Sequence, residues 1–348
     1  MDEQTLQGWV ERFPQIRVLV VGDYFLDKYL IMDRALSETS LETGLEAYQV
    51  VEVRCSPGAA GTVTSNLRAL GAQVTALGLV GDDGEGYELR RGLVARGVED
   101  KWLLTLADRF TPTYIKPLMR EPDGRMHELN RLDIKNRQPL AAAAEDELIR
   151  RLRALVPYMD AVIVADQVQE RNHGVITDRV REEIMHLAVL FRDKVFAVDS
   201  RERIGLYRHV VIKPNRREAA RAIDTGWDGD ETALTWAEIA RYGAQLFQRT
   251  GQPVFLTMGA QGVALFGAGK PQRIPAVPVT GEIDPVGAGD STMAGIVLAL
   301  AAGAAPADAA LVGNLVASIT IQQIGTTGTA SPAQLLARFR EMESGKAA

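Results

Sequence analysis

Short apolar runs recur along this chain, and most are followed by a stretch with the pattern of a helix. The first run, residues 17–21 (RVLVV), leads directly into Gly22 and Asp23. Similar runs lie at 74–80, 161–165, 195–198, 210–212 and 254–257. A short run that is apolar on both sides is typical of a parallel strand covered on both faces.

Helical patterns fill the intervals between these runs. They lie at 59–70, 85–95, 142–155, 174–191, 235–250 and 306–324. Strands and helices that alternate in this way favour a parallel sheet with helices on both sides. The sequence therefore predicts an α/β protein with three layers, α/β/α, and a mostly parallel central sheet.

Two segments break the alternation, at about 28–54 and 109–133. Neither contains a convincing helix, and short strands are indicated at 113–118 and 126–132. We expect these segments to form a small β-sheet that projects from the main domain as a lid. Because no internal repeat or low-complexity linker divides the chain, residues 1–348 are predicted to form a single domain.

Charge and composition limit the partners. The chain has 39 Lys and Arg against 45 Asp and Glu, a net charge of −6, and no long basic run, which argues against a nucleic-acid interface. The first residues lack a signal-peptide pattern, and the longest chargeless run, 291–307, is shorter than a membrane-spanning helix. One cysteine, Cys55, gives no intrachain disulfide. We expect a cytoplasmic protein with small-molecule ligands and no membrane or nucleic-acid partner.

A glycine-rich stretch, Gly287-Ala288-Gly289-Asp290, precedes a long apolar helix pattern. The unpaired amides at a helix N-terminus bind anions, and glycines let a phosphate approach closely. Asp290 is the candidate base for a phosphoryl transfer, which needs an anion site, a metal and a carboxylate. The alternative is a plain turn whose aspartate stabilises the first helical turn.

Two loops that follow predicted strands supply further candidates. Asn215 and Glu218 are expected to hold Mg²⁺, through water because magnesium loses its water reluctantly. Thr257, Gly259 and Gly262 follow the next strand and are expected to lie against a nucleotide. The alternatives are an exposed charge that opens a helix, for Glu218, and a hairpin turn, for residues 257–262.

Polar residues near the first strand are candidates for a sugar site. Asp23 and Asp27 follow that strand and can meet sugar hydroxyls, although an isolated loop aspartate is more often a cap or turn residue. Asn66 lies on a predicted helix after a glycine-rich approach that contains Gly58 and Thr62, where a polyol can come close to the backbone.

The four histidines lie far apart and form no metal-binding spacing. The chain has neither a P-loop of the Gly-x4-Gly-Lys-Ser/Thr type nor a Gly-x-Ser-x-Gly elbow. These absences disfavour zinc chemistry, a Walker-type nucleotide site and a serine hydrolase.

The segment DPVGAGDSTMAGIV, residues 284–297, closely resembles the C-terminal signature of the PfkB, or ribokinase-like, carbohydrate kinases. The resemblance runs from about residue 18 to 331. It implies a ribokinase-like kinase domain that uses ATP and Mg²⁺, with a monovalent cation left open. It also implies that Asp290 is the catalytic base, that 287–289 line the anion hole, and that Asn314 joins the residues that bind the nucleotide.

Shorter matches resemble the heptose 7-phosphate kinase branch of that family, which serves ADP-heptose synthesis: GDYFLDKY, ELNRLDIKN and VASITIQQIGTTGTAS. This resemblance implies that Lys116 and Arg131 meet a substrate phosphate, with a surface cation as the alternative for each. The resemblance to the PfkB family as a whole implies a homodimer formed through the lid. No nucleotidyltransferase half is expected after residue 331.

The substrate side departs from the family pattern. Gly58-Ala59-Ala60-Gly61-Thr62 stands where the family usually has Gly-Gly-x-x-Asn, and 165–174 lacks the lysine usual in the heptose branch. The prediction is an ATP-dependent kinase of a sugar or sugar phosphate, with heptose 7-phosphate as one candidate. The alternatives are a non-catalytic sugar or nucleotide sensor of the same fold, and a kinase for another small alcohol such as a nucleoside.

Overall fold

The computed structural model describes residues 1–346, and its centre is an eight-stranded sheet with the order β15-β14-β13-β12-β11-β10-β1-β4. The strands from β4 to β13 in this order are parallel to their neighbours, whereas β14 and β15 run antiparallel at one edge. The mostly parallel sheet predicted from the sequence is confirmed. Its strands are β1 (Arg17–Gly22), β4 (Gln73–Leu77), β10 (Ala161–Asp166), β11 (Val195–Ser200), β12 (Val211–Ile212), β13 (Val254–Thr257), β14 (Val263–Phe266) and β15 (Gln272–Ile274).

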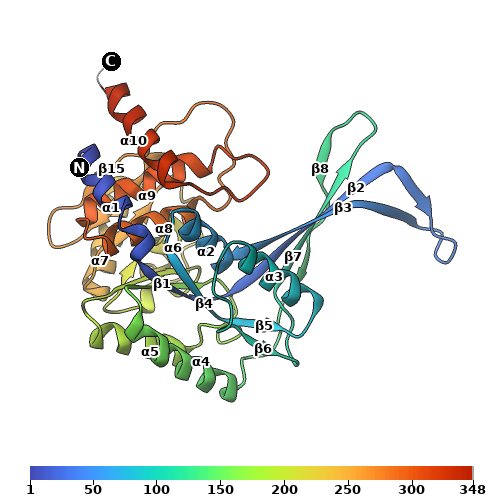
Figure 1. Cartoon of the computed structure of the whole chain (residues 1–348), viewed down its shortest axis with the longest axis horizontal. Coiled ribbons are helices and arrows are strands. Elements are labelled where there is room, and N and C mark those ends of the chain that lie inside the picture. Colours follow the sequence, from blue (N-terminus) through green and yellow to red (C-terminus); the bar gives the residue numbers. More distant parts are fainter. Residues whose placement is uncertain (347–348) are drawn as a thin grey trace.

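Helices cover both faces of this sheet, as Figure 1 shows. One layer consists of α1 (Glu3–Val10), α2 (Ala60–Ala69), α3 (Gly84–Ala95), α8 (Ala288–Ala301), α9 (Pro306–Thr320) and α10 (Pro332–Lys346). The other consists of α4 (Ala142–Leu155), α5 (Asp178–Leu190), α6 (Arg216–Ile223) and α7 (Trp236–Thr250). Side chains of β1 alternate between the two cores: Val18 and Val20 enter one, Leu19 and Val21 the other. The continuous apolar run at 18–21 is thus explained by burial on both faces.

The chargeless run at 291–307 forms most of α8, a helix buried from Ser291 to Ala299. It packs on α2 and α9 within the core of one layer. Among the described residues, no helix combines the length and apolar character needed to cross a membrane.

A second sheet projects from the main body as an arm (Figure 1). We call it the lid, and its strands are β2 (Tyr24–Thr39), β3 (Glu46–Ala59), β7 (Thr113–Arg120), β8 (Met126–Glu128) and β9 (Leu132–Ile134). Their order is β3-β2-β7-β8, with β9 paired to β7. The hairpin β2–β3 reaches further into the body than predicted, because Tyr24 and Ala59 still pair where β1 ends.

Several boundaries differ from the sequence prediction. The helix expected from residue 174 begins at Asp178, because Thr177 caps it and the preceding residues turn across the end of β10. The apolar run at 74–80 divides into β4 and β5 (Leu79–Gly81), and β5 pairs with β6 (Leu104–Leu106). The division falls at Gly78, where a Cβ would lie 2.6 Å from the carbonyl oxygen of Gly22.

Ala59 joins β3 to α2 with φ 53° and ψ −117°, a conformation that L residues rarely adopt. Such strain costs about 1–3 kcal/mol. We expect Ala59→Gly to raise the free energy of unfolding by about 1 kcal/mol, because glycine adopts this conformation freely. Chemical denaturation followed by circular dichroism measures the change.

Ala60→Gly is the matched control, because Ala60 is the first residue of α2 and its φ is negative. That substitution should destabilise by up to about 1 kcal/mol, as glycine does in a helix. Equal destabilisation by both substitutions would show that position 59 is not strained.

Candidate active site

The loops after β11, β12 and β13 meet the N-terminus of α8 at the carboxyl edge of the sheet. Lys213 Nζ, just after β12, lies 2.8 Å from Asp199 Oδ2 of β11. The same Nζ lies 3.5 Å from the position of a Cβ at Gly289, in the first turn of α8. Asn215 forms a parallel bridge to Thr257 at the end of β13. This edge is where open α/β sheets bind their ligands.

The predicted anion loop forms the start of α8. Gly287 is the N-cap residue, with φ 79°, and no side chain caps the helix. A Cβ at Gly287 would lie 2.6 Å from Thr327 Cγ2, so both conformation and packing require glycine there. The Ala288 N–H donates to the Pro285 carbonyl at 3.1 Å, whereas no described group accepts from the N–H groups of Gly287, Gly289 and Asp290, so these remain available to an anion.

Asp290 occupies the first turn of α8 and is only partly exposed. Burial, reinforced by the nearby Asp199 carboxylate, raises its pKa to about 7, while Lys213 and Arg201 act in the opposite direction. A carboxyl group with a pKa near the working pH is suited to take up a proton and release it again. This property goes beyond what an aspartate needs merely to stabilise a helix terminus.

Asn215 and Glu218 form a capping box at the start of α6. The Glu218 N–H donates to Asn215 Oδ1 at 2.8 Å, and the Asn215 N–H donates to Glu218 Oε2 at 2.8 Å. Glu218 therefore does open a helix, but it is only partly exposed, and burial together with Asp199 raises its pKa.

The Asp199 carboxylate raises the pKa of both Glu218 and Asp290, and Lys213 and Arg201 are the compensating cations. A divalent cation with oxygen ligands fits this surplus of negative charge. No three of the described His, Cys, Asp and Glu side chains approach closely enough to bind a metal directly. The arrangement is thus compatible with Mg²⁺ held through water.

The expected nucleotide loop, 257–262, lies beside the 215–218 loop. The Thr257 N–H donates to the Pro214 carbonyl at 2.8 Å. Gly259 and Gly262 have φ of 59° and 84°, and the loop connects the antiparallel pair β13 and β14, as the hairpin alternative proposed. Asn314 of α9 is buried and donates to the carbonyls of Ile274 and Pro275, so its amide nitrogen is used by the chain itself.

Asp27, Gly58 and Lys116 lie together at the base of the lid. Asp27 Oδ1 is 3.0 Å from Lys116 Nζ, which also donates to the Tyr29 hydroxyl at 3.2 Å. A Cβ at position 58 would lie 2.5 Å from Asp27 Oδ2, so Gly58 makes room for this carboxylate. Asp27 also raises the pKa of Asp290, after burial and Asp199, which places the two carboxylates in one region. Lys116 is thus bound to Asp27 rather than left open for a phosphate.

Thr62 and Asn66 face the interior of the protein. Asn66 is 0% exposed and donates from Nδ2 to the Thr62 carbonyl within α2. Thr62 is 4% exposed, and its Cγ2 lies 3.4 Å from the position of a Cβ at Gly287. In this conformation neither side chain is open to a ligand, although Thr62 packs directly behind the anion loop.

The hydrogen-bonding capacity of the Asp23 carboxylate is used by the chain itself, which the sequence prediction did not foresee. Its carboxylate accepts the N–H groups of Gln167, Val168 and Val175 at 2.8, 2.9 and 2.7 Å. Burial raises the pKa of Asp23 to about 6, against these hydrogen bonds. Asp23 fixes the loop that follows β10, and its oxygens point to that loop rather than to a sugar.

A buried ion pair holds the same loop from the other side. Arg203 Nη2 lies 2.6 Å from Asp166 Oδ1, and the guanidinium also donates to the carbonyls of Val168 and Gln169. Ser200 Oγ donates to Asp166 Oδ2 at 2.6 Å. The segment 167–175, which we call the β10 loop, is therefore fastened through its backbone by Asp23 and Arg203.

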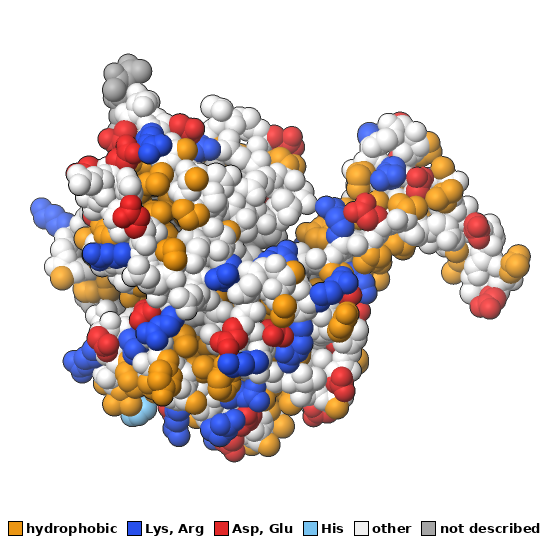
Figure 2. Space-filling view, viewed as in Figure 1, with side chains coloured by type: hydrophobic (Ala, Val, Ile, Leu, Met, Phe, Trp, Pro, Cys, Tyr) orange, Lys and Arg blue, Asp and Glu red, His pale blue; other side chains and the backbone are white. Residues whose placement is uncertain are grey.

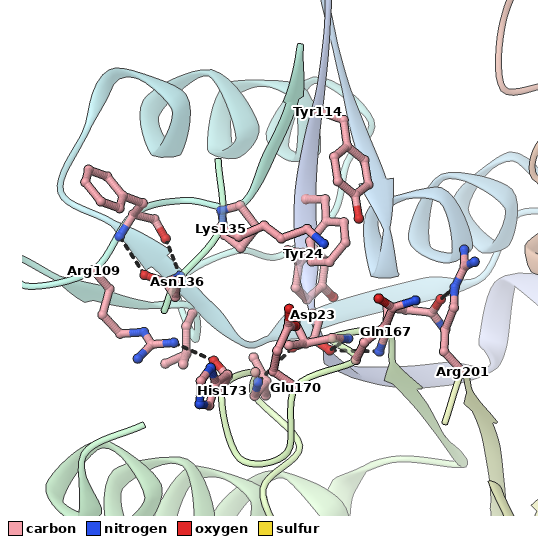
Figure 3. Close-up of a pocket in the computed structure, with 18 of the residues that line it drawn as sticks. Asp23, Tyr24, Arg109, Tyr114, Lys135, Asn136, Gln167, Glu170, His173 and Arg201 are labelled. Atoms are coloured by element: carbon pink, nitrogen blue, oxygen red, sulfur yellow. Dashed lines mark hydrogen bonds between the residues drawn. The ribbon is translucent and has the colours of Figure 1, made fainter. Parts of the chain in front are cut away.

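A cavity of about 250 Å³ opens between the β10 loop and the base of the lid (Figure 3). Its cationic and amide side chains come from separate parts of the chain: Arg109, Arg131, Lys135, Asn136, Gln167, Gln169 and Arg201. Of the predicted substrate residues, Asp23 and Arg131 line it. Arg131 is paired with Asp133 at 2.7 Å and stacks over the Tyr114 ring at 4.3 Å.

Sequence reasoning missed most of the lining. Lys135 and Asn136 lie within the segment ELNRLDIKN, which the sequence analysis had already singled out, so they could have been predicted. Arg201 directly follows the strand at 195–200, and a polar residue in that position was the signal that could have found it. Gln167 belongs to the stretch that departs from the family pattern, so no family residue pointed to it.

Comparisons with known proteins agree over nearly the whole chain. The family model described as pfkB family carbohydrate kinase matches residues 25–334. The curated "Bifunctional protein HldE" of Desulfatibacillum aliphaticivorans is 31% identical over 346 residues, which cover 98% of this chain and 67% of that protein. The protein of the same name from Citrifermentans bemidjiense is 30% identical over 339 residues, covering 97% of this chain and 66% of that protein. The chain thus spans about two thirds of the length of these relatives.

Solved structures share the fold. Arabidopsis thaliana ribokinase, complexed with ribose and ATP, superposes with a TM-score of 0.66 at 17% identity, covering 93% of this chain and 99% of that one. Phosphofructokinase-2 from Escherichia coli, in complex with potassium, gives 0.68 at 17% identity, covering 94% and 99%. The ribokinase-like architecture expected from the sequence is thereby confirmed.

Proposed function

This chain belongs to the pfkB family of carbohydrate kinases, and from that premise we propose that it transfers the γ-phosphoryl group of ATP to a sugar hydroxyl activated by Asp290. The observation that carries the proposal is the position of Asp290. Its carboxyl, with a pKa raised to about 7 by burial and by Asp199, stands in the first turn of α8 beside uncapped amides.

The reaction follows from these groups. The acceptor hydroxyl gives its proton to Asp290, and its oxygen forms a bond to the γ-phosphorus. The bond from that phosphorus to the β,γ-bridging oxygen breaks, and ADP leaves with the electron pair. The amides of Gly287 and Gly289, from which no described group accepts a hydrogen bond, would receive the phosphate charge. Mg²⁺, held through water by Glu218 and Asn215, would neutralise charge on the phosphates when bound.

We propose a sugar phosphate as the acceptor, with D-glycero-β-D-manno-heptose 7-phosphate as the first compound to test. Support comes from the relatives named HldE and from the surplus of cationic side chains in the cavity. Of the cavity's carboxylates, that of Asp23 is already bound to three backbone amides. The Lys135 ammonium has no partner among the described residues, and Figure 3 shows its side chain extending across the cavity.

The test is ADP release with ATP and Mg²⁺ over heptose 7-phosphate, fructose 6-phosphate, fructose and ribose. We expect kcat/KM for the preferred sugar phosphate to exceed that for its unphosphorylated parent at least about tenfold, the value of one charge-assisted hydrogen bond. A preference for free sugars would contradict the acceptor class. Sugar binding by calorimetry without ADP release from any acceptor would favour the sensor.

Lys135→Ala should raise KM for the phosphorylated acceptor about 10- to 100-fold and leave KM for ATP unchanged, because a charged hydrogen bond to the acceptor is lost. Lys101→Ala is the matched control, since Lys101 is 65% exposed and pairs with Glu99 outside the cavity. Steady-state kinetics with each substrate varied in turn measures both constants. An unchanged acceptor KM in Lys135→Ala would remove Lys135 from the site.

We further propose that two copies of the chain associate through their lids. β3 is an edge strand of the lid sheet, and its Val51 and Val53 are 45% and 54% exposed. Figure 2 shows hydrophobic side chains gathered along the projecting arm. A long apolar edge strand left open to water is prone to pair with another chain.

Sedimentation at micromolar concentration is expected to show a dimer, which the double substitution Val51→Lys and Val53→Lys should convert to a monomer. Val94→Lys serves as the control, because Val94 is 56% exposed but lies on α3. A monomeric unmodified protein would contradict the lid interface.

A further inference from the structure

Arg201 has free hydrogen-bond donors and lies between the cavity and the carboxylates of the candidate active site. It directly follows β11, and its backbone N–H donates to the Asp166 carbonyl at 3.1 Å. Its Nε donates to Gln167 Oε1 at 2.9 Å. No described residue accepts a hydrogen bond from its Nη1 or Nη2. One edge of the guanidinium is therefore held by Gln167, and the other edge is free to bind a ligand.

The other arginines around the cavity have at least one terminal nitrogen engaged by the chain. Arg131 is held by Asp133 through two hydrogen bonds, at 2.7 and 2.9 Å. Arg109 donates to the carbonyls of Gln138, Pro139 and His173. Arg203, beneath the β10 loop, is bound to Asp166. Arg201 is thus the arginine of this region whose geometry leaves both terminal nitrogens available to a ligand.

The place of Arg201 connects the cavity with the carboxylates of the candidate active site. It lines the cavity on the side opposite Arg109, as Figure 3 shows. Two residues before it in sequence, Asp199 is paired with Lys213 beside the first turn of α8. Its positive charge also reaches Asp290 and Glu218, where it counteracts the effect of burial on the pKa.

We propose that Arg201 is a further catalytic residue that binds the non-bridging oxygens of the phosphoryl group during transfer, and that Gln167 is a positioning residue that holds its guanidinium in place. This inference rests on the proposed kinase function. The acceptor binds in the cavity, and the phosphoryl group of ATP lies over the first turn of α8. During transfer the phosphoryl group therefore moves between these two places, and Arg201 lies beside its path.

The chemistry of arginine suits this task. Charge spreads over the three non-bridging oxygens as the bond to the acceptor oxygen forms and the bond to the leaving ADP breaks. A planar guanidinium with two free nitrogens can bind two of those oxygens at once, and it does so without accepting or giving up a proton. The proton of the acceptor hydroxyl still goes to Asp290.

The direct test uses a mimic of the group in transit. Binding of ADP with Mg²⁺ and aluminium fluoride is compared with binding of ADP and Mg²⁺ alone, by calorimetry, in the unmodified protein and in Arg201→Gln. We expect Arg201→Gln to weaken the aluminium fluoride complex about 100-fold and ADP alone less than about threefold, since removal of one donor to a transition-state charge has about that effect. Arg201→Lys should recover only part of the loss.

Turnover gives the second readout. With the best acceptor, Arg201→Gln should lower kcat about 100-fold and leave the melting temperature nearly unchanged, because the side chain is exposed and bound only to Gln167. Guanidinium added to Arg201→Ala should restore part of the rate. Gln167→Ala should lower kcat about tenfold, as expected for loss of orientation alone. Arg171→Gln, at a 75% exposed arginine that pairs with Asp178, is the control and should change nothing.

The outcomes separate the two proposals. Failure of the unmodified protein both to release ADP with any acceptor and to bind the aluminium fluoride complex would overturn the kinase function itself. An active parent with unchanged kcat and unchanged aluminium fluoride binding in Arg201→Gln would overturn only the role of Arg201. The same holds if Arg201→Gln raises acceptor KM alone, which would make Arg201 a binding residue for the acceptor.

Discussion

Replacing Asp290 by asparagine is expected to lower kcat about 10³-fold, because it removes the proposed base while keeping the size of the side chain. The unmodified protein should show kcat/KM rising with pH through about 7, the pKa to which burial and Asp199 raise this carboxyl, and the rise should disappear in Asp290→Asn. Activity within about threefold of the unmodified protein would reject Asp290 as the base.

Asp308→Asn is the matched control for the plain alternative, an aspartate that merely stabilises a helix terminus. Asp308 occupies the first turn of α9, as Asp290 does in α8. Its substitution should leave kcat unchanged. If both substitutions changed only stability, and by similar amounts, the helix-terminus explanation would hold for both.

The same substitution should act on stability with a definite sign. The folded carboxyl of Asp290 has a pKa of about 7 against an ordinary value of 3.8, so folding favours its protonated form. The ionised form therefore costs stability above about pH 7, and the cost fades as the pH falls toward 4. Asp290→Asn should raise the free energy of unfolding more at pH 8 than at pH 4. The reverse order in urea denaturation would contradict a raised pKa.

Removal of the Lys213 side-chain charge is the second substitution with a large expected effect. Lys213 is 3% exposed and lies 2.8 Å from Asp199, so Lys213→Met leaves a carboxylate without its partner. The free energy of unfolding should fall by about 3–5 kcal/mol. The pKa of Asp290, which burial raises and Lys213 lowers, should rise further.

A higher pKa of Asp290 predicts that the acidic limb of the pH–rate profile moves to higher pH in Lys213→Met, and that the rate at neutral pH falls at least about tenfold. Lys194→Met provides the comparison, because Lys194 donates to the carbonyls of Pro157 and Met159 and pairs with no carboxylate. A pH–rate profile that does not shift in Lys213→Met would show that Lys213 does not influence the pKa of Asp290.

The layers of the fold could be predicted from the sequence because the patterns of strands and helices are local. Residues 18–21 are apolar at every position, a pattern typical of a strand buried on both faces. Strand β15 was missed because it is short and lies at the edge, where only Ile274 is buried. All four residues of β14 are buried, but a run of four apolar residues is too short to identify a strand from its pattern alone. The extent of β2 was missed because its pairing with β3 and β7 is set by the tertiary fold.

The candidate site was predictable in part for a similar reason. Gly287 and Asp290 belong to one continuous motif, so their roles could be proposed together. Asp23 and Arg201 depend on partners about 145 and 34 positions away, in the β10 loop, and no local pattern records those contacts. A carboxylate that binds a sugar and one that binds backbone amides look the same in a sequence.

The way the β10 loop is fastened bears on how this enzyme can change. Asp23 and Arg203 form hydrogen bonds with backbone N–H and carbonyl groups of the β10 loop, not with its side chains. Substitutions at Gln169 and Glu170, which line the cavity, can therefore alter the surface that meets the acceptor without releasing the loop. Acceptor preference can diverge in this wall while the α8 turn and its base stay unaltered, which makes these two positions the natural targets for a library that seeks new acceptors.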